Sequence, residues 1–376
     1  MLDAVLAGLM SARHLADALK VGDPAHLQYA LCVESAFAAS LGGGLLTKRS
    51  RRATALAETL AARTNDPYGW GWVYGSSATV AYWQERWPEV VPQGERAIDI
   101  FNTQCTAAAW EATTLQTFLL ASLSHLGRVR ELTQRLPTIL EDARRRGDLF
   151  ALSIVRTGHT VLAPLAADDP DRALRDAEAM LAPFQADHFT SQHFHHFIAT
   201  VQAHLYADEP WKAWSLVVGA WPALRQVGYL FLACLACQLR YLRALAALAA
   251  ADAPPPDALR AWTPRRLEQV AQREARLLAR ATVPSGAPRA AAIQATLAAR
   301  RGHRAGQRSS LVAAVEGFDR VQMALHREAA RLQLAALDGS APSRAEAEAR
   351  FRDEEVRNPL ALLRTLMPGP PPAPPV

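Results

Sequence analysis

The sequence predicts an all-α protein, organised as a tetratricopeptide-like α-solenoid of antiparallel helix pairs with a period of about 40 residues. Composition is the first reason. Half of the 376 residues are hydrophobic and only 7% are aromatic, and most of the hydrophobic residues are Ala and Leu, which lose little rotamer freedom in a helix. The second reason is periodicity, because apolar residues recur at intervals of three and four, as at Leu132, Leu136, Ile139 and Leu140.

A recurring turn is the third reason. Four segments combine a helix end, a tight turn and a new helix, and they are marked by Pro88, Arg128, Pro170 and Pro210. Proline suits the first turn of a helix, where its missing N–H would be unpaired anyway, and Asp169 or Asp208 before it can cap the new helix. One more period back reaches Lys48, so the register holds for about five units. Stacked helix pairs of this kind bury one continuous core.

The regularity weakens after residue 250, and we expect three parts. Helical repeats occupy 1–250, further helical repeats with a closing helix occupy 257–366, and a disordered Pro-rich tail occupies 367–376. Within the second part we expect helices at 257–281, 289–301, 309–337 and 343–363. The tail contains six prolines, which have no N–H to donate, so it cannot form a helix.

The charge of the chain is concentrated in one span. The net charge is +5, and the span from Asp257 to Arg308 holds eleven arginines against three acidic residues. Such a span can bind nucleic acid or form a solvated helix face. Because the span contains Trp262 but no series of interleaved aromatic residues for base stacking, and no helix-turn-helix signature is present, we favour the solvated face and keep nucleic-acid binding as an alternative.

Two clusters contain residue types that bind metals. Cys234 and Cys237 form a C-x-x-C, but they lie inside an Ala/Leu helix without a second ligand pair, which favours core packing. His193 and His196 are three residues apart and could share a helix face, with Asp187 expected to cap that helix. Phenylalanines alternate with these histidines, so we favour packing over a partner contact, a pH-sensitive role or a metal site. We therefore expect no metal and no cofactor.

Trp110 and Glu111 are the third candidate site. They lie in a helix expected at 106–126, one repeat after Trp83 and Trp87. Aromatic residues at helical spacing usually belong to the core between repeats, and we expect the same of Trp110. A carboxylate beside that core needs a cation, and we expect Glu111 to form an ion pair with Arg156. The candidate interaction residues are thus Trp110, Glu111, Arg156 and His193.

The sequence offers no catalytic motif. The segment from Gly42 to Lys48 lacks the second glycine of a phosphate-binding loop, and no protein-kinase, serine-hydrolase or zinc-protease signature is present. The apolar run 229–237 is shorter than the roughly 20 residues that span a bilayer, and the N-terminus does not resemble a secretion signal. We expect a cytoplasmic protein that is not an enzyme.

Several of these segments carry a resemblance to a known family. They are Ala109–Glu111, His125–Gly127, Leu165–Ala173, Phe189–His193, Val356–Pro359 and Leu366–Gly369. Together they resemble the C-terminal tetratricopeptide-like region of large bacterial serine/threonine kinases of the myxobacterial and planctomycete type, which also carry a signalling ATPase module. The spacing of the last two segments is one residue longer than in that family, and the kinase and ATPase domains are absent from this chain.

The resemblance implies a non-catalytic scaffold, the regulatory arm of a kinase–ATPase signalling protein. Its partner would be the kinase or ATPase domain, encoded in the same gene or separately. The alternatives are a nucleic-acid-binding module that uses the Arg-rich span 260–308, a metal- or redox-sensing module that uses the Cys and His clusters, and an orphaned fragment without independent function.

Overall fold

The computed structural model describes residues 4–184 and 188–369, and all regular structure in those residues is helical. Three short segments of the described residues are 3-10 helices, namely η1 (Gly158–Val161), η2 (Tyr229–Phe231) and η3 (Asp257–Leu259). The α-helices are α1 (Ala4–Val21), α2 (Pro24–Leu41), α3 (Gly44–Thr64), α4 (Pro67–Trp83), α5 (Trp87–Thr103), α6 (Ala109–Leu126), α7 (Val129–Arg146), α8 (Leu149–Val155), α9 (Leu162–Ala166), α10 (Pro170–Leu181), α11 (Ser191–Tyr206), α12 (Pro210–Gln226), α13 (Ala233–Ala250), α14 (Pro264–Leu278), α15 (Gly286–Arg300), α16 (Arg304–Arg320), α17 (Ala324–Asp338), α18 (Ala341–Asp353) and α19 (Pro359–Leu366).

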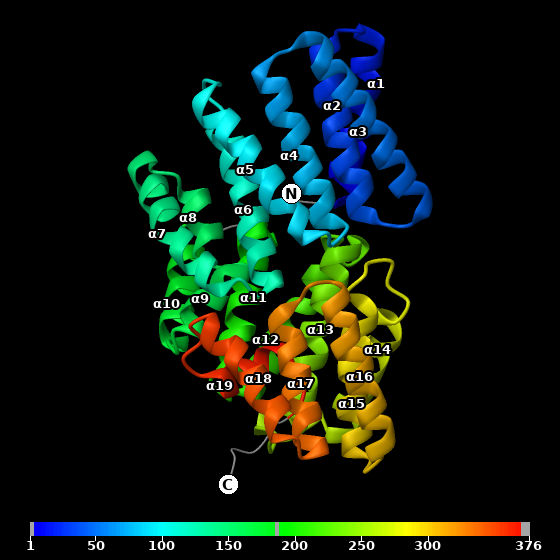
Figure 1. Ribbon diagram of the computed structural model, residues 1–376, viewed down its shortest axis with the longest axis vertical. Coiled ribbons are helices and arrows are strands. Elements are labelled where there is room, and N and C mark those ends of the chain that lie inside the picture. The colour runs from blue at the N-terminus through cyan, green and yellow to red at the C-terminus, as the bar shows by residue number, and fades with distance from the viewer. Residues whose placement is uncertain (1–3, 185–187, 370–376) are drawn as a thin grey trace. The chain divides into compact units, whose positions relative to one another are not determined.

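Consecutive helices pack in pairs, as the solenoid prediction requires. In the N-terminal part, α2 packs on α3 and α4 on α5, while α2 also contacts α4, so the first helices of neighbouring repeats touch (Figure 1). The second helices of successive repeats begin about 40 residues apart, at Gly44, Trp87, Val129, Pro170 and Pro210. The all-α helical-repeat prediction is therefore confirmed.

The chain divides into two compact units. Unit 1 contains the described residues of Met1–Leu123, Phe189–Ser191 and Leu224–Ala236. Unit 2 contains those of Ser124–His188, Gln192–Ala223 and Cys237–Val376, and in it α14 to α18 pack one after another along the chain.

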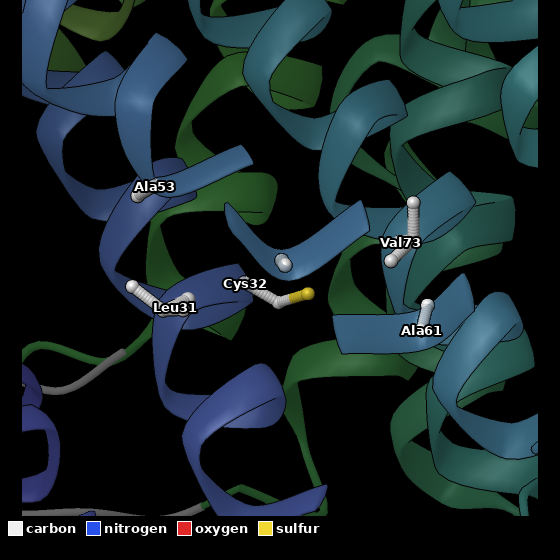
Figure 2. Close-up of a cluster of buried hydrophobic side chains, with 6 residues drawn as sticks. Leu31, Cys32, Ala53, Ala61 and Val73 are labelled. Carbon is white, nitrogen blue, oxygen red and sulfur yellow. The ribbon is translucent and has the colours of Figure 1, made fainter. Parts of the chain in front are cut away.

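Small side chains let the helices of unit 1 approach closely. One core cluster surrounds Cys32 of α2 with alanines of α3 and Val73 of α4 (Figure 2). Two residues before Val73 in α4, a Cβ added at Gly71 would lie 2.6 Å from the Phe101 ring of α5, so a larger residue there would displace the ring. The Ala-rich composition therefore sets the spacing of the helices as well as their stability.

The predicted turns share one hydrogen-bond pattern. Before α5, the Arg86 N–H donates to the Ala81 carbonyl at 2.8 Å and the Glu85 N–H donates to the Tyr82 carbonyl at 3.0 Å, which closes α4 with a left-handed residue. Equivalent bonds close the helices before α10 and α12. The left-handed residue is glycine in only some of these turns, since Glu85, Asp168 and Asp208 adopt φ near +60°. Asp169 caps α10 as expected, accepting the Arg172 N–H at 2.9 Å.

The helix boundaries expected in the C-terminal part were wrong in three places. The helix expected at 257–281 begins only at Pro264, where Thr263 caps it. The segment 309–337 contains two helices, α16 and α17, because Gln322 takes φ 57° and ends the first. The segment 343–363 is likewise divided into α18 and α19, because Glu355 takes φ 61° and Asn358 caps a new helix at Pro359.

The first three residues of the expected disordered tail are ordered. Met367 is fully buried, and the Pro368 carbonyl accepts hydrogen bonds from Thr296 at 2.8 Å and Gln333 at 3.1 Å. Residues 367–369 are therefore part of unit 2, and residues 370–376 lie outside the described residues.

Candidate functional site

A partly exposed cluster of aromatic side chains lies on the first helices of unit 1. We call it the aromatic surface, and it consists of Tyr29 of α2, Tyr68 and Trp72 of α4, and Glu111 of α6, together with Trp110, which precedes Glu111 in the chain. The Tyr29 and Trp72 ring centroids are 4.5 Å apart and edge to face, and those of Tyr68 and Trp72 are 6.4 Å apart. Trp110 is 59% exposed and Tyr68 39% exposed, so this surface presents large rings to solvent.

The repeat itself brings Tyr68 and Glu111 together. Asp66 caps α4 by accepting the Gly69 N–H at 2.9 Å, which places Tyr68 in the first turn and Trp72 one turn later on the same face. Glu111 lies in the first turn of α6, one repeat further along the chain. Stacking of the two first helices then lets the Tyr68 hydroxyl donate to the Glu111 carboxylate at 2.7 Å.

Glu111 gives the aromatic surface a negative potential. Burial raises the pKa of Tyr68 to about 12, helped by its hydrogen bond to Glu111. Burial also raises the pKa of Tyr29, with a contribution from the Glu111 charge. The pKa of the nearby Cys105 thiol is raised by burial and by the carboxylates of Asp66 and Glu111. A cationic group would be stabilised beside these carboxylates.

The structure corrects two predictions about this site. Trp110 is not a core residue, whereas Trp83 and Trp87 are buried as expected. Trp110 lies near the start of α6 and is 59% exposed. Arg156 does not pair with Glu111. It pairs with Asp176 of α10, a helix that packs against its own helix α8 in unit 2.

The histidine cluster forms local contacts. His196 Nε2 lies 3.0 Å from Glu178, and the pKa of His193 is lowered by burial and by the neighbouring His196 and His188. No group of three or more His, Cys, Asp or Glu side chains is arranged to hold a metal within the residues that the structure describes. Asp187, the expected cap, lies outside them, and a partner contact at His193 stays a prediction.

The C-x-x-C motif lies inside α13, and both of its cysteines are buried and free of disulfides. The Cys237 sulfur lies 3.4 Å from the Ser285 hydroxyl and accepts from Arg289 Nη1 at 3.3 Å. The core location expected for this motif is confirmed.

The Arg-rich span carries many ion pairs within unit 2. Arg300 contacts both Asp252 and Glu268, and Arg308 contacts Asp338 at 3.0 Å. Carboxylates from outside the span therefore neutralise part of its charge. This arrangement favours the solvated, structural interpretation over nucleic-acid binding.

Sequence reasoning missed Tyr29, Tyr68 and Trp72. One available signal was the Asp66-Pro67 helix start, which fixes the first turn of α4 and thus the shared face of Tyr68 and Trp72. That this face is exposed depends on how the neighbouring helices stack, which no local pattern encodes.

Comparison with known proteins finds no matching family model, no matching curated protein and no matching solved structure.

Among the described residues, helix α13 is long and apolar enough to cross a bilayer, and 72% of it is buried inside the structure. The bent pair of helical segments Leu149–Val155 and Gly158–Ala166 is also long and apolar enough when the two are taken together as one span. The buried core helix of a soluble protein can have the same length and composition.

Proposed function

We propose that this chain is a non-catalytic protein-interaction scaffold that holds its partner at the aromatic surface. The observation that carries the proposal is the exposure of Trp110 and Tyr68 beside the carboxylate of Glu111. Tyr and Trp dominate the binding energy of protein interfaces because they bury a large area with few rotatable bonds. An exposed cluster of this kind is a candidate contact surface.

The partner segment has a definite chemistry under this proposal. Aromatic rings offer flat apolar area and can receive a cation on their faces. Glu111 and Asp66 favour positive charge at the same place. The best match is a segment that presents an Arg or Lys next to an apolar side chain.

The resemblance to kinase-associated helical regions suggests where that segment comes from. We propose a serine/threonine kinase or a signalling ATPase domain, in the same polypeptide or in a separate one, with this chain as its regulatory arm. Trp110 and Glu111 belong to one of the segments that carry the resemblance. The chain itself would then contribute recognition and no phosphoryl transfer.

Affinity capture with matched variants tests this proposal. Tagged wild-type chain, Trp110→Ala and Phe231→Ala are incubated with native lysate, Phe231 being an equally exposed aromatic residue of unit 1 outside the aromatic surface. We expect a kinase or ATPase to bind wild type and Phe231→Ala and to be lost from Trp110→Ala. A partner retained equally by all three would remove the aromatic surface from the proposal, and capture of chaperones alone would favour the orphaned-fragment alternative.

A further inference from the structure

The outer face of α1, the first helix of unit 1, presents large apolar side chains to solvent. Leu9, Met10 and Val21 are each 50% or more exposed. The terminal helix of a repeat protein normally has a polar outer face, because no neighbouring repeat packs on it. Large apolar side chains gathered on one exposed face are instead typical of a contact surface. The outer face of α1 is therefore a candidate interface.

Packing on α2 fixes the orientation of α1 (Figure 1). A Cβ added at Gly8 would lie 2.6 Å from the Phe37 ring of α2, so the two helices approach closely there. Further along α1, the Ser11 hydroxyl donates to the Glu34 carboxylate at 3.3 Å, and Ala18 is buried. Because helical side chains repeat every 3.6 residues, these contacts turn the opposite side of α1 away from α2. That side carries positions 9, 10, 13, 17, 20 and 21, all of which are exposed.

Two opposite charges lie in the middle of this outer face. Arg13 and Asp17 are four residues apart, so they lie one turn from each other on the same side of the helix. Asp17 also pairs with Lys20 of the same helix at 3.2 Å, and both of those side chains remain largely exposed. Along α1 the outer face thus runs from an apolar end through a cation and an anion to Val21.

We propose that the outer face of α1 binds the same face of a second copy of this chain, with the two α1 helices antiparallel about a twofold axis. In a twofold interface, residue i of one copy contacts residue j of the other, and j contacts i. When Arg13 faces Asp17 of the second copy, the two charges form a pair twice. The same register places Leu9 opposite Val21, so the apolar ends of the face also meet twice.

Met10 and Lys20 complete this register. They lie opposite each other when Arg13 faces Asp17, and the methylene stem of a lysine can cover an apolar side chain while its ammonium group stays in water. Each exposed group of the outer face therefore meets a chemically suitable group of the second copy.

Other pairings of the two faces are less favourable. An antiparallel pair centred on Arg13 would bring two guanidinium groups together, and one centred on Asp17 would bring two carboxylates together. A parallel pair in register would place both kinds of like charge side by side. Like charges facing each other across an interface oppose association. The outer face of α1 is complementary to itself in the antiparallel register, which is why a second copy is the occupant.

The dimer formed in this way is a weak one. Stable interfaces bury roughly 1,200–2,000 Å² in total, and a single helix from each copy provides less. We therefore expect reversible association that depends on protein concentration. This inference does not rest on the proposed function, because no residue of the aromatic surface takes part in it.

Sedimentation velocity of the full chain over a hundredfold range of concentration tests the proposal. We expect wild type to form a dimer. Arg13→Asp and Asp17→Arg should each associate at least tenfold more weakly, because each substitution places like charges in both symmetric contacts. An equimolar mixture of the two variants should dimerise again, since the acidic face of one then meets the basic face of the other. Mixing cannot restore an interaction made within a single helix. The control Arg265→Asp, at an exposed arginine of α14, should behave as wild type does.

Three results would overturn the proposal. A wild-type chain that stays monomeric would leave the outer face to a different occupant, a further segment of polypeptide or another protein. Single variants that dimerise as wild type does, or a mixture that stays monomeric, would exclude the charge pairing. Assemblies larger than a dimer would indicate a head-to-tail contact in place of the twofold one.

A further variant tests the apolar ends of the face by the same measurement. Leu9→Ser should weaken the dimer several-fold, because Leu9 is expected to pack on Val21 of the second copy. The matched control is Leu149→Ser, at a leucine of α8 that is 55% exposed, and it should leave the association unchanged. Equal association of Leu9→Ser and wild type would contradict the register.

Discussion

The Tyr206 hydroxyl donates to the Asp168 carboxylate at 2.6 Å, and the same carboxylate oxygen accepts from Asn358 Nδ2 at 3.3 Å. Beside them, the Arg357 N–H donates to the Ala166 carbonyl at 2.8 Å. The segments Leu165–Ala173 and Val356–Pro359 thus form one joint in unit 2, although Asp168 and Asn358 are 190 residues apart in sequence.

Substitution of Asp168 should weaken this joint. Asp168→Ala removes both hydrogen bonds and places a Cβ without a polar group at φ 58°, and we expect a loss of roughly 1–3 kcal/mol in the free energy of unfolding. Asp168→Gly relieves the backbone strain and should lose less. Urea unfolding measures both variants against Asp171→Ala, an exposed acidic residue of the same turn. Equal midpoints for Asp168→Ala and Asp171→Ala would contradict the role assigned to the joint.

The bond between Tyr68 and Glu111 has a spectroscopic signature. The pKa of Tyr68 is raised to about 12 by burial and by the carboxylate, so Glu111→Gln should lower it towards the ordinary tyrosine value near 10. The ultraviolet absorbance of tyrosinate during an alkaline titration measures this, and Tyr68→Phe identifies which of the seven tyrosines is responsible. A Tyr68 titration unchanged in Glu111→Gln would show that burial alone sets its pKa.

Unit 2 should lose stability in acid. The pKa values of His159 and His326 are lowered to about 3 and that of His195 to about 4, chiefly by burial. Below pH 6.5 the unfolded chain binds protons that the folded unit does not, so stability falls as the pH drops from about 6.5 towards these values. Each such histidine contributes about 1.4 kcal/mol per pH unit.

Urea unfolding at pH 7 and pH 5 checks the sign and the size of this effect. We expect a lower midpoint at pH 5, and a smaller difference between the two pH values in His326→Phe, which removes one of the titrating rings. A midpoint that stays constant or rises on acidification would show that these rings are solvated and titrate normally.

Local sequence signals predicted the repeat but not its surface. The proline-marked turns and the Asp169 cap depend on neighbours within a few residues. The period of about 40 residues follows from the spacing of those turns, so the sequence could predict it as well. The turns at Gln322 and Glu355 were missed because left-handed residues other than glycine leave no clear signature. The exposure of Trp110 and the pairing of Arg156 with Asp176 depend on how separate helices stack.

ATP should leave the thermal stability of the isolated chain unchanged. A ligand that binds the folded state raises the melting temperature according to its concentration and affinity. The sequence contains no phosphate-binding loop. Differential scanning fluorimetry with and without Mg²⁺-ATP, with chloride as the ionic-strength control, measures the effect. A saturable rise with ATP but not with chloride would reveal a nucleotide site and would contradict the scaffold proposal.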